Sequence, residues 1–141
     1  MKHIKQRTGW DCGIASAACI AGCSYSVAAR FAPASVHISG IDPLQMLSML
    51  RALTGYHWSI IDGRGIPLRE LELPGYCMVW IDGGRAWIGD RAVMHVIVYD
   101  RGTIYDPGHV IKRNLAQYHK RHWSIAYFFV ASRRAARKAA D

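Results

Sequence analysis

The first part of the chain carries a helical pattern of apolar residues. Residues 13–23, GIASAACIAGC, are small and helix-compatible, and apolar positions recur there at spacings of three and four. Asp11 or Thr8 is expected to cap the start of this helix, which puts Cys12 in its first turn. A second, shorter helix is expected over residues 26–31.

The clearest helix is expected over residues 42–55, DPLQMLSMLRALTG. Asp42 suits the N-cap, Pro43 suits the first helical position, and Gln45 completes a capping-box-like pattern. Gly55 provides the stop signal. Four leucines are expected to form the apolar face: Leu44, Leu47, Leu50 and Leu53.

After residue 55 the period of the pattern changes. Short runs rich in β-branched and aromatic residues are separated by turn signals such as DGRG, DGGR and DRG. Strands are expected at 58–61, 76–81, 87–88, 94–99, 103–105 and 124–131, and a further short helix at 113–119. Helices come first and strands later, which predicts the α+β class, with an N-terminal helical layer packed on a C-terminal antiparallel sheet.

The length and composition indicate one domain. A chain of 141 residues that is 51% hydrophobic can bury one core, which we expect to span residues 1–131, followed by a basic tail at 132–141. The sequence contains neither the roughly 18 consecutive apolar residues of a membrane span nor a segment resembling a signal peptide. A cytoplasmic location without a membrane span is therefore expected.

The formal net charge of +8 favours anionic partners, although the same charge also keeps a small protein soluble. Part of it lies in the tail sequence SRRAARKAAD. Because no zinc finger, phosphate-binding glycine loop or RNA-binding signature accompanies it, nucleic acid is not the expected partner.

Cys12 differs from the other three cysteines. In a reducing cytoplasm all four are expected as thiols, and we interpret Cys19, Cys23 and Cys77 as small buried hydrophobes. The thiolate is the reactive form of cysteine, and the N-terminus of a helix favours it. Cys12 is therefore the candidate nucleophile.

The candidate base is His95, which lies in the otherwise apolar strand MHVIVYD, where an imidazole without a partner would cost desolvation. The following segment YDRGTIYDP returns the chain through a tight turn. If Asp100 and Arg101 are the turn residues, Asp106 falls opposite His95 on one face of the sheet, whereas a three-residue turn would shift the pairing by one. A carboxylate in that place would orient the imidazole, as a catalytic triad requires.

Other assignments stay open. His109 is the second candidate for the base, and Asp90 is the second candidate for the acid. A zinc site is a further possibility, although its cysteine and histidine pairs lack the short-loop setting usual for structural zinc. That site would use Cys19, Cys23, His119 and His122.

Several of these residues together resemble a known family. Gln6 stands five positions before the Asp-Cys-Gly at 11–13, and an apolar strand with His and a strand ending in Asp-Pro follow. This pattern is similar to the papain-like cysteine peptidases that process bacteriocins at double-glycine leaders, over about residues 4–131. The resemblance implies a papain-like fold with Cys12 as nucleophile, His95 as general base, Asp106 as its orienting acid and Gln6 as an oxyanion-hole donor.

The function implied is that of a thiol hydrolase that cleaves a peptide or isopeptide bond through an acyl-enzyme intermediate, without cofactor or metal. The substrate would be a protein or peptide, with an acidic character or a Gly-Gly site as the two features considered. Two alternatives remain: a related thiol acyltransferase or deamidase with the same triad, and a basic binding or inhibitor module on a papain-like scaffold.

Overall fold

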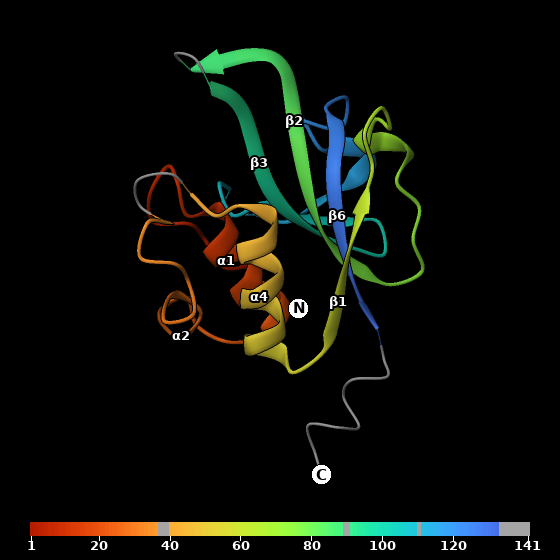
Figure 1. Ribbon diagram of the computed structural model, residues 1–141. Coiled ribbons are helices and arrows are strands. Elements are labelled where there is room, and N and C mark those ends of the chain that lie inside the picture. The colour runs from red at the N-terminus through yellow and green to blue at the C-terminus, as the bar shows by residue number, and fades with distance from the viewer. Residues whose placement is uncertain (37–39, 89–90, 110, 133–141) are drawn as a thin grey trace.

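A layer of helices packs against one face of a six-stranded antiparallel sheet (Figure 1). The computed structural model describes residues 1–36, 40–88, 91–109 and 111–132, and gives only the backbone for 84–88 and 91–93. The α+β class predicted from the sequence is confirmed. The helices are α1 (Cys12–Ala21), α2 (Tyr25–Ala29) and α4 (Pro43–Thr54). The strands are β1 (His57–Asp62), β2 (Tyr76–Ile88), β3 (Arg91–Asp100), β4 (Thr103–Tyr105), β5 (Arg113–Asn114) and β6 (Ser124–Ser132), in the spatial order β1-β6-β2-β3-β4-β5.

Helix α4 has the predicted ends but a partly different buried face. The Asp42 carboxylate accepts the Gln45 backbone N–H at 2.8 Å, the Gln45 side chain accepts the Asp42 N–H at 3.0 Å, and Gly55 closes the helix with φ 71°. Leu44 is 71% exposed, so the expected leucine face was wrong at that position. The buried residues are Met46, Met49 and Leu50, because α1 packs beside the methionines.

The expected helix at 113–119 was also wrong. Residues Arg113–Asn114 form the edge strand β5, which pairs with β4, and only Leu115–Gln117 make a single 3-10 turn, η2. The Asn114 side chain accepts the Ala116 N–H at 2.9 Å and starts this turn. Pairing with the free edge of β4 therefore prevails over local helix propensity. The two strands expected at 76–81 and 87–88 are one long strand, β2, with a register shift between Asp82 and Trp87.

The sheet buries apolar residues on both faces. On β2, Met78 and Trp80 pack with the residues of α1 and α4, whereas Cys77, Val79 and Ile81 belong to a second cluster on the other face. This alternation follows from the two-residue period of a strand. The second cluster is covered by the segments that carry Leu68, Leu71, Leu115 and Tyr118.

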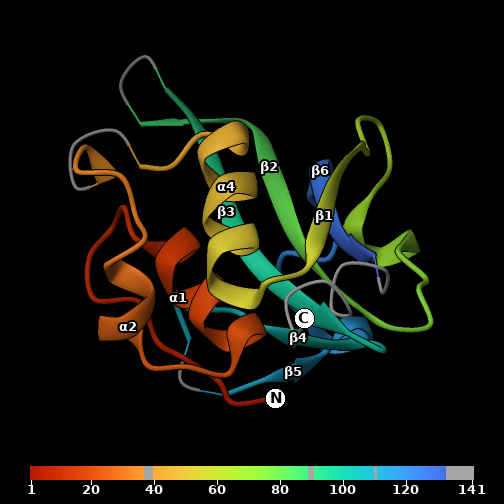
Figure 2. The same ribbon diagram turned by 60° about the horizontal axis from the view of Figure 1, so that its bottom comes forward.

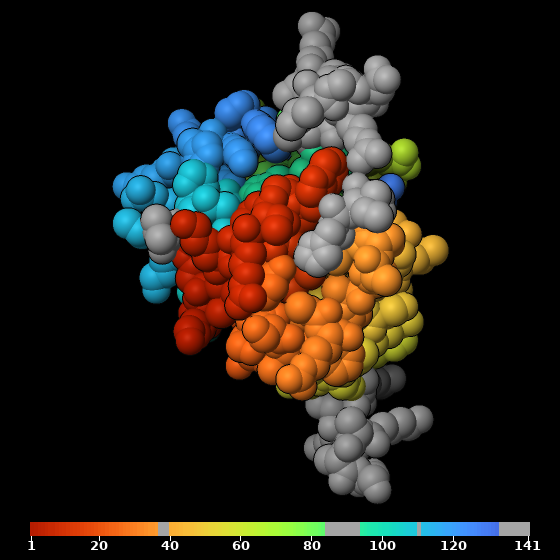
Figure 3. Space-filling view, turned by 90° about the vertical axis from the view of Figure 1, so that its left-hand side faces the viewer, coloured from red at the N-terminus to blue at the C-terminus, as the bar shows by residue number. Residues whose placement is uncertain are grey.

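The N-terminal segment lies along the part of the chain that follows β4. The His3 Nε2 atom lies 2.6 Å from the backbone oxygen of Asp106, and the Gln6 N–H donates to the Pro107 carbonyl at 2.8 Å. Figure 2 shows the N-terminus beside β5, and Figure 3 shows this segment against the residues that follow β3. The first residues of the chain are thereby brought to the same edge of the sheet as Asp106.

Within the described residues, no helix has the length and apolar character needed to cross a bilayer. Strand β6 continues to Ser132, and the basic residues 133–141 lie outside the described part of the chain.

Candidate active site

Cys12 is the first residue of helix α1, as the sequence predicts. Its side chain is partly buried, and the thiol is free of any disulfide. The neighbouring Gly13 allows α1 to approach α4 closely, since a Cβ there would lie 2.7 Å from Cε of Met46. The glycine after the cysteine therefore serves helix packing, which fixes where the start of α1 lies.

Asp11 does not cap α1, contrary to expectation. Its buried carboxylate turns back and accepts the backbone N–H groups of Arg7 at 3.0 Å and Thr8 at 2.9 Å, together with the Tyr25 hydroxyl. Burial would raise the pKa of Asp11, but these hydrogen bonds lower it below its usual value. Asp11 thus holds the loop between Gln6 and Cys12, and its side chain makes no cap hydrogen bond to the first N–H groups of the helix.

Helix α1 is fixed to strand β3 one turn after Cys12. The buried Ser16 hydroxyl donates to the Val96 carbonyl oxygen at 3.2 Å. Strand β4 pairs only with residues 98–100 of β3, so this carbonyl lies on an edge that β4 does not cover. Because Ser16 lies one helical turn after Cys12, and Val96 follows His95, this contact sets the nucleophile beside the candidate base.

His95 joins Cys12 to Asp106. Its Nε2 atom lies 2.6 Å from Asp106 Oδ1, its side chain is 12% exposed, and the neighbouring Cys12 side chain helps to raise the pKa of this imidazole. Since Asp106 occupies Nε2, Nδ1 is the ring nitrogen left for the thiol. The structure thus brings together the three residues that the sequence predicts as nucleophile, base and acid.

The Asp106 carboxylate is fully supplied with hydrogen-bond donors. Oδ1 accepts from His95 and from the Gly108 N–H at 2.8 Å, and Oδ2 accepts the Tyr118 hydroxyl at 2.5 Å. The residue is 2% exposed and follows β4 directly. Sequence reasoning missed Tyr118, because it lies in a segment predicted as a helix, and no local pattern connects it with Asp106.

The site stabilises opposite charges on His95 and Asp106. Burial alone would lower the pKa of His95, but hydrogen bonds and charge from Asp106 and Cys12 raise it to about 9. Burial would raise the pKa of Asp106, yet His95, Tyr118 and the Gly108 N–H hold it well below its usual range. The geometry therefore favours an imidazolium paired with a carboxylate at neutral pH.

Gln6 lies beside this triad, but its amide is already partly engaged. The side-chain nitrogen donates to the Thr8 carbonyl at 2.7 Å, and Oε1 is buried without a hydrogen-bond partner among the described residues. A Cβ added at Gly108 would lie 3.6 Å from Gln6 Oε1 and 3.9 Å from His95 Cε1, so the amide adjoins the imidazole. One amide hydrogen of Gln6 remains for a ligand.

The other candidates are not part of the bond between His95 and Asp106 Oδ1. His109 is half-exposed, with Nε2 3.8 Å from Asp106 Oδ2, whereas His95 uses Oδ1. Asp90 falls outside the described residues. Among the histidines, cysteines and acids that the structure describes, His119 is grouped with His109 and Asp106, so the alternative zinc set of Cys19, Cys23, His119 and His122 is not assembled.

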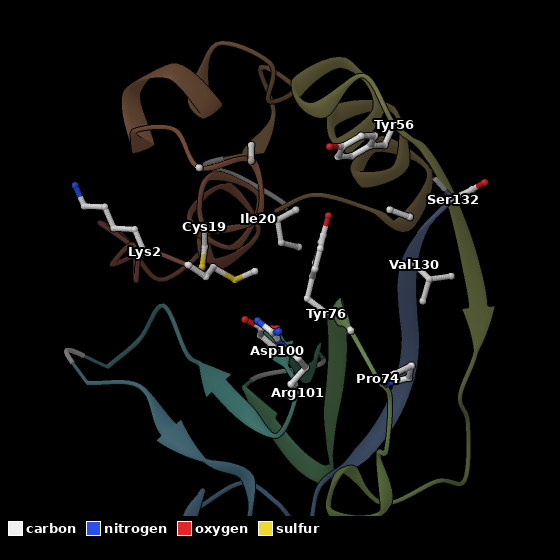
Figure 4. A pocket seen from close by; sticks show the side chains of 15 residues that line it. Lys2, Cys19, Ile20, Tyr56, Pro74, Tyr76, Asp100, Arg101, Val130 and Ser132 are labelled. Carbon is white, nitrogen blue, oxygen red and sulfur yellow. The ribbon is translucent and has the colours of Figure 1, made fainter. Parts of the chain in front are cut away.

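Cys19 and Cys77 are buried, as the sequence predicts, and burial raises the pKa of both to about 12. Cys19 lies near the far end of α1, in the lining of a pocket of about 980 Å³. Figure 4 shows this pocket with Lys2, Cys19 and Tyr76 around it. At 1.5 Å per residue, the end of α1 at Ala21 is ~14 Å from Cys12, so this pocket is separate from the triad.

No family model matches this sequence, and no curated protein matches it. What the site can do therefore follows from its own residues. The site has a partly buried thiol at a helix start, an adjacent imidazole bonded to a buried carboxylate, and an N-cap residue whose side chain leaves the helix N–H groups alone. These are the components of nucleophilic acyl transfer.

Proposed function

We propose that the protein is a papain-like thiol hydrolase that cleaves a peptide or isopeptide bond through a covalent acyl-enzyme. The observation that carries this proposal is His95, whose Nε2 atom lies 2.6 Å from Asp106 Oδ1 and whose pKa is raised in part by the neighbouring Cys12 side chain at the first position of α1. Nucleophile, base and orienting acid within hydrogen-bond reach of one another are the signature of an activated thiol.

The surroundings of the triad also support the proposal. A helical layer carries Cys12 and an antiparallel sheet carries His95, which agrees with the arrangement that the sequence resemblance implies. The Ser16 bond to β3 and the Tyr118 bond to Asp106 restrain the two sides of the site. Neither bond is required by the packing of an inert core, because apolar residues could fill both positions.

In the first half of the reaction, the Cys12 thiolate attacks the substrate carbonyl carbon, and a carbon–sulfur bond forms while the carbonyl electrons move to oxygen. The Cys12 backbone N–H and the remaining amide hydrogen of Gln6 would stabilise this oxyanion, and one such donor is worth roughly 3–4 kcal/mol of barrier. When the carbon–nitrogen bond breaks, the His95 Nδ1 proton passes to the leaving amine.

In the second half, His95 acts as a base. It takes a proton from water, whose oxygen attacks the thioester carbon, and the carboxylic product leaves as the Cys12 thiolate is restored. Throughout both halves, Asp106 holds the imidazole through Nε2 and stabilises its positive charge. An amine in place of water would give acyl transfer, and a Gln side chain in place of the peptide would give deamidation.

For the substrate we propose a protein or peptide segment that is acidic or carries a Gly-Gly site. The net charge of +8 favours an acidic segment. A free thiol nucleophile also suits a reducing, cytoplasmic setting.

An acyl-enzyme test with a thiol-directed activity probe addresses the proposal directly. A peptide aldehyde or vinyl sulfone should modify the wild type at one residue, Cys12, and Cys12→Ala should abolish the reaction. Cys23→Ala is the matched control, because Cys23 is also a partly buried free thiol and lies outside the triad. Equal modification of Cys12→Ala and wild type would contradict the assignment.

Substrate capture separates a hydrolase from a binding module. Cys12→Ala removes one sulfur at a position where alanine suits a helix, so the fold should persist. A hydrolase should release its partner cleaved, whereas the variant should retain the same partner intact. Equal recovery of an uncleaved partner by both proteins, with no adduct on Cys12, would instead identify a basic binding module.

A further inference from the structure

A second group of side chains with metal-binding chemistry lies on the side of Asp106 away from His95. Asp106, His109 and His119 each present one ligand atom, and these three atoms lie within 4.8 Å of one another. The two imidazole rings meet edge to face with centroids 4.7 Å apart. They line a pocket of about 410 Å³, in which Asp106 is the only acid among the lining residues.

The donor set and its spacing suit a zinc-class ion. Two donors bound to one tetrahedral zinc at about 2.0–2.1 Å lie about 3.3 Å apart. His109 Nε2 already lies 3.8 Å from Asp106 Oδ2. The rings of His109 and His119 are exposed, so they can rotate to bring the donor atoms to the spacing that zinc requires. Two imidazoles and one carboxylate, with an open position for water, form a set that zinc uses in other proteins.

The charges around the pocket select against harder cations. Arg113 lines the same pocket, and its charge opposes any cation held mainly by electrostatic attraction. Magnesium and calcium prefer several oxygen ligands, and this pocket offers one carboxylate. Zinc forms strong bonds to imidazole nitrogen, so this set favours zinc over both.

We propose that His109, His119 and the Oδ2 atom of Asp106 form a zinc-class metal site whose occupation inhibits the hydrolase. The site itself is independent of the enzymatic activity, whereas its inhibitory effect rests on the proposed function. A zinc ion at Oδ2 competes with the Tyr118 hydroxyl for that oxygen and draws the carboxylate charge away from Oδ1. The bond that orients His95 is thereby weakened, without any contact between the metal and Cys12.

Metal binding is measured on the Cys12→Ala protein, which removes the thiol as a competing ligand. Titration with CoCl2 should give visible absorption at one equivalent per chain, without a thiolate-to-cobalt charge-transfer band, and ZnCl2 should displace the cobalt. His109→Ala and His119→Ala should each weaken binding by about 100-fold or more, because loss of even an outer-shell partner costs about 10- to 100-fold. His122→Ala is the control for an exposed neighbouring histidine and should bind as before.

The metal site would be overturned if cobalt does not bind stoichiometrically, if both histidine variants bind it as tightly as the Cys12→Ala protein, or if a thiolate band appears. Inhibition is tested separately, on the wild type and His119→Ala with a peptide substrate. Zinc should lower kcat in the wild type, a chelator should restore it, and His119→Ala should need about 100-fold more zinc. Binding without inhibition would overturn only the regulatory effect, and binding to a chain that shows no hydrolysis would refute the proposed function but leave the metal site.

Discussion

Tyr118→Phe removes a single hydroxyl group from the far side of the Asp106 carboxylate. The Tyr118 oxygen lies 2.5 Å from Asp106 Oδ2, and the side chain is 1% exposed, so phenylalanine keeps the packing and deletes one hydrogen bond. A hydrogen bond to a charged group contributes about 1.5–3 kcal/mol. Because Asp106 is itself 2% exposed, water cannot readily replace the donor. We expect the free energy of unfolding to fall by about that amount, ~1.5–3 kcal/mol.

The same substitution should also lower activity. Oδ1 keeps its bonds to His95 and Gly108, but Oδ2 loses its nearest donor, so the carboxylate gains freedom to turn. We expect kcat to fall by about 10-fold, which corresponds to about 1.4 kcal/mol of barrier. The Michaelis constant should change little, because Tyr118 is buried and reaches the substrate only through Asp106 and His95.

Tyr99→Phe is the matched control for this prediction. Tyr99 is 3% exposed in the same apolar cluster, and among the described residues its hydroxyl hydrogen-bonds only with the backbone of Leu73, at 3.3 Å from the nitrogen and 3.4 Å from the oxygen. The Tyr99→Phe variant should have a lower free energy of unfolding but an unchanged kcat. Urea unfolding and initial rates of peptide hydrolysis measure the two quantities. Full activity in Tyr118→Phe, or an equal loss of activity in Tyr99→Phe, would refute the positioning role of Tyr118.

Three further predictions concern the remaining contacts of the site. Iodoacetamide at neutral pH should modify Cys12 before Cys77, because burial raises the pKa of Cys77 to about 12; peptide mass spectrometry measures the order, and the reverse order would contradict the nucleophile assignment. Ser16→Ala should lower the free energy of unfolding by about 1 kcal/mol and also reduce kcat, since its bond to the Val96 carbonyl holds α1 beside β3; an unchanged kcat would show that this bond does not position Cys12. Stability should fall as the pH rises from about 6.5 to about 9, because His95 has the raised pKa and the folded state holds the extra proton in that window; this slope should diminish in Asp106→Asn, and urea titrations with the same slope in both proteins would exclude the ion pair as its cause.

The local elements could be predicted where side chains and backbone determine them together. Asp42, Gln45 and Gly55 fix the two ends of α4 through hydrogen bonds made within a few residues, and the structure has all of them. The face that α4 buries depends instead on where α1 crosses it. That crossing places Met46 against Gly13, a long-range contact that no local period encodes.

The pairing of His95 with Asp106 was predicted through a register that is wrong by two residues. The turn residues are Arg101 and Gly102, with φ of 47° and 90°, rather than Asp100 and Arg101. Asp100 therefore pairs with Thr103, and the same register would put Asp106 opposite Ile97 instead of His95. A shift of two keeps side chains on the same face, whereas a shift of one would have reversed them. The contact therefore forms between diagonal neighbours.

The contacts that restrain the triad could not be predicted, because each joins segments far apart in the sequence. Ser16 and Val96 are 80 residues apart, and His3 reaches the Asp106 carbonyl across 103 residues. A serine within an alanine-rich helix carries no signal of its partner. These bonds follow from the docking of α1 and the N-terminal segment at the sheet edge, which only the assembled fold defines.

That docking depends on the point at which β4 ends. Pro107 has no N–H to continue a ladder, and β4 stops at Tyr105, so the edge of β3 beside His95 has no neighbouring strand there. The free edge is used twice: the start of α1 approaches it through Ser16, and the Asp106 carboxylate turns towards His95. A longer β4 would cover the Val96 carbonyl that Ser16 now binds, and would keep α1 away from the imidazole. The interruption of the sheet after Tyr105 is therefore the structural feature that allows a thiol on a helix and a carboxylate after a strand to meet at one histidine.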